Sequence, residues 1–191
     1  MAAAHDSEDP RRAPRARPHE AGRLCVARTI KRMTIDALLP ADWPAVRAIY
    51  EEGLDLGTFD ELVPTWEEWD RGHLIWPRLV ARDAGVVVGW AALAPYSDRS
   101  CYRGVAENSI YVARSARGRR VGRALLERLC LEADAAQIWT LQAGILAANE
   151  ASIKLHAACG FRLVGVREKL ARKRGEWSDV VLMERRSTNV G

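Results

Sequence analysis

Two kinds of apolar pattern follow one another along this chain, and together they predict an α/β protein. Short apolar or alternating runs, typical of strands, are separated by stretches in which apolar residues recur every three or four positions, as on one face of a helix. The expected strands are Met33–Leu38, Arg78–Arg82, Val86–Leu93, Val105–Val112, Ile138–Ile145, Phe161–Leu170 and Trp177–Met183. The expected helices are Pro40–Leu54, Thr65–Trp76, a helix that carries Val121–Leu129, and Asn149–Cys159. The order β-α-α-β-β-β-α-β-α-β-β predicts helices packed on a mixed sheet.

Turn residues support several of these boundaries. Asp83-Ala84-Gly85 and Arg174-Gly175 each lie between two expected strands and predict hairpins. Gly160 is placed to close the helix that ends at Cys159. In the helix after Val121 the apolar face is interrupted by Arg128, whose aliphatic stem can lie along that face while its charge stays in water.

Composition and charge bound the class of protein. The chain has 191 residues and is 48% hydrophobic, which is enough for one domain with a sizeable core. Its formal net charge of +4 lies entirely in residues 1–32, and the remaining residues carry equal numbers of each sign. This distribution argues against a nucleic-acid-binding surface on the folded part. No apolar run reaches the roughly 18–20 residues needed to cross a bilayer, so no membrane partner is expected.

Residues 1–32 are expected to lie outside the fold. They are rich in Ala, Arg and Pro and contain too few large apolar residues to order themselves. We interpret them as a disordered basic leader or as an over-long start assignment, because Met33 opens the first expected strand. An organellar transit peptide is disfavoured by four acidic residues, and a nucleic-acid-binding arm is a further alternative. The expected organisation is this leader, one domain over residues 33–187, and a tail over residues 188–191.

The four cysteines are scattered and form no C-x-x-C pair. That spacing argues against a structural zinc site or a disulfide framework, so no metal is expected. Unpaired cysteines are typical of a reducing compartment, which favours a cytoplasmic protein.

The most informative segment is a strand, a basic glycine-containing turn and a helix start. Val105–Val112 leads into a turn with Gly118 and Gly122, around which four arginines gather. Free amides in the first turn of a helix and the helix dipole favour an anion at that place. The alternative is a solvated surface turn, which would have a similar composition. The two familiar glycine patterns of mononucleotide- and dinucleotide-binding loops are missing, which argues against those two ligand classes. The segment therefore predicts a site for a different phosphate-bearing ligand.

This segment resembles the GCN5-related N-acetyltransferase (GNAT) superfamily, in which Q/R-x-x-G-x-G/A binds the pyrophosphate of acetyl-CoA. The matching stretch is Arg117–Gly122, with Arg120 in place of the usual middle glycine; a frame shifted by two, Arg119–Ala124, also fits. The resemblance runs from Met33 to Arg186 and is strongest to the phosphinothricin and arsinothricin N-acetyltransferase branch. Shared landmarks are Ala41-Asp42-Trp43, Gly57-Thr58-Phe59, Val105-Ala106-Glu107, Ile110-Tyr111-Val112, Ala143-Gly144-Ile145, Asn149, Ser152, Leu155-His156, Gly160-Phe161 and Gly175–Val180.

The resemblance implies roles for individual residues. Glu107 would be the base that takes a proton from the acceptor's ammonium, because a protonated amine cannot attack a thioester. His156 stands seven residues after Asn149 and would protonate the departing CoA thiolate. Glu107 could instead be an outward-facing strand residue, His156 a histidine satisfied by backbone or water, and Asn149 a helix cap. Tyr111 shares a strand face with Glu107 and is an alternative proton donor.

The implied ligand contacts form two sets. Acetyl-CoA is expected on Ile110, Tyr111, Val112, Arg117, Gly118, Arg119, Arg120, Val121, Gly122, Arg123 and Asn149. The acceptor is expected on Phe59, Arg99, Tyr102, Lys173 and Trp177. The implied fold is a mostly antiparallel central sheet flanked by helices, with splayed central strands.

The implied function is acetyl transfer from acetyl-CoA to the amine of a small glutamate-like compound, such as phosphinothricin, methionine sulfoximine or arsinothricin, with detoxification as the benefit. Alternatives are another amine (a protein N-terminus, a polyamine or an aminoglycoside), a non-catalytic acyl-CoA-binding protein, or a nucleic-acid adaptor that uses the basic leader. The branch also suggests a homodimer.

Overall fold

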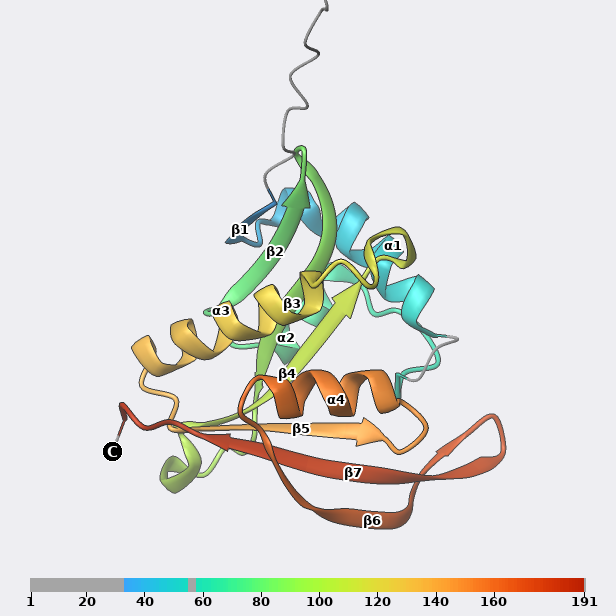
Figure 1. The fold of residues 1–191 in the computed structure, drawn as a ribbon, viewed down its shortest axis with the longest axis vertical. Helices are drawn as coiled ribbons and strands as arrows, with labels where there is room; N and C mark the ends of the chain where they lie inside the picture. Colours follow the sequence, from blue (N-terminus) through green and yellow to red (C-terminus); the bar gives the residue numbers. More distant parts are fainter. Residues whose placement is uncertain (1–32, 55–57, 191) are drawn as a thin grey trace, which may run out of the picture. The chain divides into compact units, whose positions relative to one another are not determined.

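A computed structural model describes residues 33–54 and 58–190, and these form a mixed sheet flanked by helices (Figure 1). The sheet has seven strands in the order β1-β2-β3-β4-β5-β7-β6. The strands are β1 (Thr34–Ala37), β2 (Arg78–Asp83), β3 (Val86–Pro95), β4 (Val105–Val112), β5 (Thr140–Leu146), β6 (Arg162–Lys173) and β7 (Glu176–Arg186). The α-helices are α1 (Trp43–Leu54), α2 (Trp66–Gly72), α3 (Val121–Ala135) and α4 (Glu150–Ala158). The predicted order of elements and the α/β class are both confirmed.

The two predicted hairpins form where their turn residues allow a tight reversal. Asp83 pairs with Val86 across Ala84 and Gly85, which have φ of 51° and 85°. Lys173 pairs with Glu176 in the same way, across two residues that also have positive φ. Two consecutive residues with positive φ give the turn whose twist matches that of the flanking strands.

One pair of strands is parallel, and it separates early. β4 and β5 pair only from Val105–Thr140 to Glu107–Gln142, although β4 continues to Val112 and β5 to Leu146. On its other edge β4 stays paired with β3 from Ala106 to Val112. The fork after Glu107 confirms the predicted splayed strands and leaves one backbone edge of β4 without a strand partner among the described residues.

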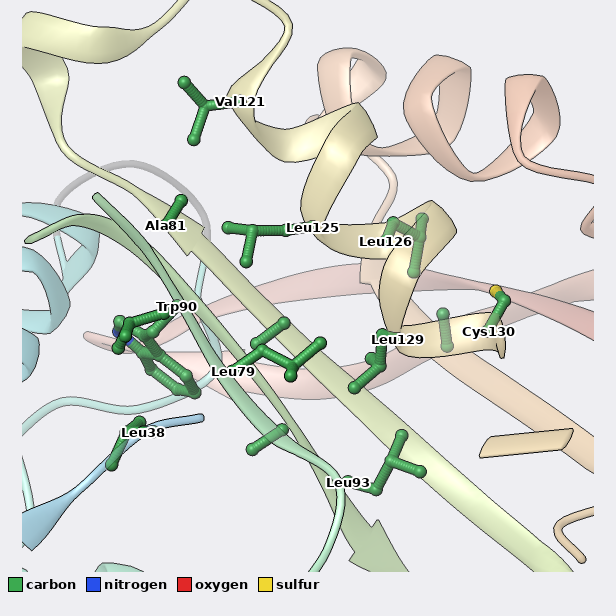
Figure 2. Packing of buried hydrophobic residues seen from close by; sticks show 14 of the residues in the cluster. Leu38, Leu79, Ala81, Trp90, Leu93, Val121, Leu125, Leu126, Leu129 and Cys130 are labelled. Carbon is green, nitrogen blue, oxygen red and sulfur yellow. The ribbon is translucent and has the colours of Figure 1, made fainter. Parts of the chain in front are cut away.

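The helices cover both faces of the sheet. In Figure 1, α3 and α4 lie across one face, while α1 packs against β3 and β4 from the other. Figure 2 shows Val121, Leu125 and Leu129 of α3 directed at the strands that carry Leu79 and Leu93. These side chains are almost fully buried, so the predicted apolar face of α3 is the face that forms the core.

Several predicted bounds differ from the structure; β6 and β7, for example, run on to Lys173 and Arg186 rather than ending at Leu170 and Met183. Three further differences have a local cause. The helix expected over Thr65–Trp76 is only α2, because the chain turns extended at His73 and because Pro77 disfavours helical geometry at Trp76. The helix expected from Pro40 begins as a single 3₁₀ turn, Pro40–Asp42. The strand expected from Ile138 begins at Thr140, because Ile138 still belongs to the turn after α3 and bonds back to Ala133.

Candidate active site

The carboxylate of Glu107 stands at the fork between β4 and β5. The side-chain amide of Gln142, the residue paired with it on β5, donates a hydrogen bond from Nε2 to Glu107 Oε2 at 3.2 Å. Both side chains line a cavity of about 240 Å³. Glu107 is partly accessible, so a small molecule in the cavity would reach its oxygens.

The cavity is lined mainly by apolar residues, but its polar and apolar surfaces are similar in extent. Its remaining lining residues are Phe59, Gly144, Arg167, Leu170, Ala171, Val180 and Leu182. Gly144 keeps the space beside the carboxylate open, since a Cβ there would lie 3.6 Å from Glu107 Oε1 and 3.9 Å from the Phe59 ring. Arg167 of β6 is the one cation in this lining, and its guanidinium makes no hydrogen bond or ion pair with any described residue. The cavity thus offers one anionic and one cationic group to a small ligand.

Asn108, the next residue of β4, faces the opposite side of the sheet and meets α4. Its amide lies 2.9 Å from His156 Nε2, and His156 Nδ1 lies 2.8 Å from the carbonyl oxygen of Ser152. A carbonyl only accepts, so Nδ1 carries the proton and Nε2 accepts from Asn108 Nδ2. Burial lowers the pKa of His156 below its usual value, which keeps the ring neutral. Among the described residues Asn108 Oδ1 has no partner, although it is buried.

Tyr111 shares the Glu107 face of β4, as predicted, but it belongs to an aromatic cluster. Its ring stacks on Trp90 with centroids 4.6 Å apart, and its hydroxyl lies 2.6 Å from Thr58 Oγ1. Burial raises the pKa of Tyr111 to about 12, so the hydroxyl stays protonated at neutral pH. Tyr50 packs on the same ring, and its hydroxyl donates to Asp60. This network fixes the segment that carries Phe59.

The turn before α3 is built to receive an anion. α3 has no acidic residue in its first turn and no side-chain cap, so the amides of its first turn have no partner within the helix. Gly118 has φ of 72°, and a Cβ there would meet nothing within 4 Å. Arg120, which replaces the motif glycine, takes the left-handed conformation with φ of 63°. The backbone therefore follows the path that a glycine would allow, and the residues present fit the diphosphate of a CoA ester.

The arginines of this turn are held by different groups. Arg119 bonds to Asp83 at 2.6 Å and Arg123 to Glu127 at 2.7 Å. Arg117 folds back and donates from Nε to the carbonyl oxygen of Val112 at 3.2 Å. The guanidinium of Arg120 is exposed and makes no hydrogen bond or ion pair with any described residue. Arg120 is thus the most readily available cation beside the free amides.

The other expected CoA contacts also lie around the fork. Ile110, Tyr111 and Val112 follow the point where β4 and β5 part, so their main chain borders the gap. Val121 is buried in the core, and Gly122 lies against Leu155 and Val112. Asn149 caps α4 by accepting from Ser152 N at 3.1 Å, as the alternative interpretation expected, and capping is compatible with a ligand contact.

The expected acceptor residues do not all gather at the cavity. Phe59 lines it, but Arg99 and Tyr102 lie in the exposed β3–β4 loop, where Tyr102 packs on Tyr96. Lys173 donates from Nζ to the carbonyl oxygens of Leu54 and Thr58 at 2.8 and 2.9 Å, so its ammonium is used by the end of α1 and by the residue next to Phe59. Trp177 is exposed under the guanidinium of Arg172.

Two cavity residues were missed by sequence reasoning. Gln142 was hidden because its place beside Glu107 depends on the register between β4 and β5. Arg167 was hidden in a run of charged residues, and a register shift between Arg167 and Ala171 sets its position on β6. A polar residue inside the otherwise apolar run of β5 was the available signal for Gln142.

Two further findings concern metal binding and membrane spans. Within the described parts of the chain, no group of three or more His, Cys, Asp or Glu side chains is placed to hold a metal ion. No helix in those same parts is long and apolar enough to span a bilayer.

The fold and the fork-centred site define an acetyltransferase of the GNAT class. The model of the acetyltransferase (GNAT) family matches residues 43–161. The chain belongs to this family and is an acetyl-CoA-dependent N-acetyltransferase.

Individual relatives narrow the comparison. The chain is 37% identical to a phosphinothricin N-acetyltransferase of Alcaligenes faecalis, over 80% of this chain and 81% of the relative. It is 32% identical to an L-methionine sulfoximine/L-methionine sulfone acetyltransferase of Pseudomonas aeruginosa, over 75% and 88%. A phosphinothricin acetyltransferase from Sinorhizobium meliloti, solved in complex with acetyl-CoA, superposes with a TM-score of 0.75 at 32% identity, covering 83% of this chain and 90% of that one. A ribosomal-protein-alanine N-acetyltransferase from Brucella melitensis gives 0.73 at 35% identity, covering 81% and 99%.

Proposed function

We propose that this protein transfers acetyl from acetyl-CoA to the amine of a small, glutamate-like amino acid, and that the reaction detoxifies it. The observation that carries the proposal is the cavity at the fork, which is lined by both Glu107 and Arg167. Relatives named for phosphinothricin and for methionine sulfoximine support this acceptor class.

Glu107 is the proposed base. The acceptor amine arrives as an ammonium, and a carboxylate oxygen takes one of its protons, which frees the lone pair for attack. The amine nitrogen forms a bond to the thioester carbonyl carbon of acetyl-CoA, and the carbon–sulfur bond then breaks. The second proton that the nitrogen loses balances the one gained by the departing thiolate, so CoA thiol is released. The backbone edge of β4 after Glu107 lacks a strand partner, so amides near Val112 are the proposed donors to the oxyanion.

Arg167 supports an anionic acceptor. A guanidinium is always charged and matches carboxylate or phosphinate oxygens with paired donors. A neutral amine or a polyamine would gain nothing from this cation, and a polyamine would be repelled by it. The cavity volume of about 240 Å³ also suits a single amino acid better than an aminoglycoside.

The donor is proposed to lie between the arginine turn and the fork. The predicted contacts along Arg117–Arg123, the main chain of Ile110–Val112, and Asn149 are kept as this proposal. The free amides of the first turn of α3 support it.

The role of His156 stays a prediction. Both ring nitrogens are bonded inside the protein, so proton donation to the thiolate would require Nε2 to exchange its bond with Asn108. These contacts support a positioning role for His156 rather than proton donation. They give no more support to Tyr111 as the proton donor, because its hydroxyl is bonded to Thr58. Roles for Arg99, Tyr102, Lys173 and Trp177 in acceptor binding also stay predictions.

A homodimer is part of the proposal. β6 is an edge strand, and β6 with the adjacent part of β7 exposes a row of large apolar side chains. They are Leu163, Val164, Val166, Leu170 and Trp177. Such a row on a sheet edge favours pairing with a second copy. Sedimentation analysis of Val166→Glu should give monomer where the parent gives dimer; a monomeric parent would contradict this part.

We also propose that residues 33–187 form the catalytic domain and that the enzyme acts in the cytoplasm. The helices and strands described run from Thr34 to Arg186. Cys101, Cys130 and Cys159 are free thiols, which suits a reducing compartment. The expected leader and the last residue of the tail lie outside the described residues.

A thiol-release assay over an amine panel tests the function. The panel contains phosphinothricin, methionine sulfoximine, arsinothricin, spermidine, an aminoglycoside and a peptide with N-terminal alanine. We expect acetyl-CoA-dependent release of CoA with the three glutamate-like compounds. Turnover confined to the peptide, the polyamine or the aminoglycoside would show that the acceptor belongs to that class instead of the glutamate-like amino acids. Tight acetyl-CoA binding without any turnover would favour a non-catalytic acyl-CoA-binding protein.

A further inference from the structure

Gln142 lies at the last paired position before β4 and β5 separate, directly across from Glu107. Neighbouring residues of a parallel pair project to the same face, so both side chains enter the cavity. Gln142 Nε2 donates to Glu107 Oε2 at 3.2 Å. Among the described residues, this is the only hydrogen bond of the Gln142 side chain.

The chemistry of this bond fixes which end of the amide faces Glu107. An ionised carboxylate only accepts hydrogen bonds, so the amide nitrogen of Gln142 must face it. The amide oxygen is then left as an acceptor at the cavity, without a partner among the described residues. The two side chains together present two acceptors, the Glu107 carboxylate and Gln142 Oε1, to whatever enters.

A primary ammonium needs such a pair. After one proton passes to Glu107, the amine keeps two N–H bonds and a lone pair that must point at the thioester carbon. A hydrogen bond from one N–H to a fixed oxygen limits rotation about the carbon–nitrogen bond and helps to aim the lone pair.

We propose that Gln142 binds the acceptor amine through Oε1 and positions the base Glu107 through Nε2. This inference rests on the acetyl transfer proposed above and assigns a second residue to the amine end of that site. A glutamine that only filled space in β5 would affect folding but would not affect the acceptor or the protonation of the base.

The test compares Gln142→Leu and Gln142→Glu with a matched control, Thr140→Val. Thr140 lies on the same strand and face two residues earlier, is half-buried, and makes no side-chain contact with Glu107 among the described residues. For each variant we would measure melting temperature, acetyl-CoA affinity by calorimetry, KM and kcat for the best amine of the panel, and the pH dependence of kcat/KM.

Gln142→Leu should raise the acceptor KM about threefold to tenfold, the loss expected for one hydrogen bond. It should also move the acid limb of the pH profile up by about half a pH unit, because a donor to the ionised carboxylate is gone. Gln142→Glu should move that limb further in the same direction, since two adjacent carboxylates resist joint ionisation. Acetyl-CoA affinity should be unchanged in both variants, and Thr140→Val should match the parent in every kinetic readout.

The proposal is overturned if Gln142→Leu keeps the parent's KM and acid limb, or if only its melting temperature changes. An equal effect of Thr140→Val would also overturn it. Failure of the unmodified protein to turn over any amine would instead remove the acetyl transfer itself, which separates the two failures.

Discussion

Two neighbouring residues of β4, Glu107 and Asn108, each meet one polar side chain on opposite faces of the sheet, but the two faces differ in how open they are. Glu107 touches the amide of Gln142 and opens onto a cavity. Asn108 touches His156, whose ring is almost fully buried and bonded at both nitrogens. Each face pairs one titratable side chain with one amide, but only the Glu107 pair has room for a substrate.

The difference shows how one strand can serve two purposes. On the closed face, where Asn108 meets α4, burial lowers the pKa of His156 and keeps its ring neutral. The hydrogen bond between the two residues links α4 to the sheet. On the open face the strands have separated, so the carboxylate is accessible, and its second oxygen has no hydrogen-bond partner among the described residues. The alternation of side chains along a strand separates a buried polar pair from an accessible one by a single residue.

Apart from removal of the Glu107 carboxylate itself, the largest effect is expected from filling the cavity on the Glu107 face. A Cβ at Gly144 would fit at ordinary contact distances, 3.6 Å from Glu107 and 3.7 Å from Val180, but larger side chains would take up the cavity. Gly144→Leu should therefore lower kcat/KM for the acceptor about 100-fold or more by misplacing the amine. Gly144→Ala is the graded control. Acetyl-CoA affinity and melting temperature should change little, and retained turnover in Gly144→Leu would break the distinction between the faces.

A smaller effect is expected from the cation of the open face. Arg167→Gln should raise KM about tenfold for anionic acceptors and leave KM for a neutral amine ester nearly unchanged. Arg172→Gln is the matched control, because Arg172 is a cation on the same strand that covers Trp177 outside the cavity. Initial rates over an acceptor series measure both values. An equal rise in the two variants, or for both acceptor types, would refute a specific role for Arg167.

Two histidines that are buried or partly buried, His156 and His73, should make the stability of the protein depend on pH. Burial lowers the pKa values of His156 and His73, so near pH 6 the unfolded chain binds more protons than the folded one. The free energy of unfolding should then fall as pH drops below about 6.5, by up to about 1.4 kcal/mol per pH unit per histidine.

Urea unfolding between pH 7.5 and 5 measures this dependence. His156→Gln removes one of the two titrating rings and keeps a polar side chain of similar reach, so its slope should be shallower than the parent's. Identical slopes in the two proteins would mean that His156 is not buried as a neutral ring.

The smallest effect is expected at the turn before α3. Arg120 has φ of 63°, which an L residue adopts at a cost and glycine does not. Arg120→Gly should stabilise the fold by about 0.5–1 kcal/mol, since the strain relieved exceeds the added freedom of the unfolded chain. The same change should weaken acetyl-CoA binding by removing a cation. A loss of stability, or tighter binding, would contradict this account of the replaced motif glycine.

Much of the fold could be read from the sequence because it is encoded locally. β4 has the predicted bounds, Val105–Val112, and both hairpins form at their predicted turn residues. The end of α2 was predicted too late because the tryptophan spacing extends past His73, whereas the backbone there turns extended.

The site could be predicted only in part. Glu107 and the arginine turn follow from motifs along one segment; the structure puts Glu107 at the fork and the arginine turn directly before α3. Gln142 and Arg167 depend on how distant strands pair, which the sequence does not state. The same reason explains Lys173, whose ammonium holds carbonyl oxygens more than 100 positions away, at Leu54 and Thr58, rather than lining the cavity.

The most direct test compares the two faces in one assay of CoA release with the preferred amine. Glu107→Gln should fold, bind acetyl-CoA with the parent's affinity, and lose about 10²–10⁴ in kcat. His156→Gln should keep kcat within about tenfold of the parent, as expected for a positioning residue. Unchanged turnover in Glu107→Gln, with the main loss in His156→Gln, would place the chemistry on the opposite face of β4 and contradict the account.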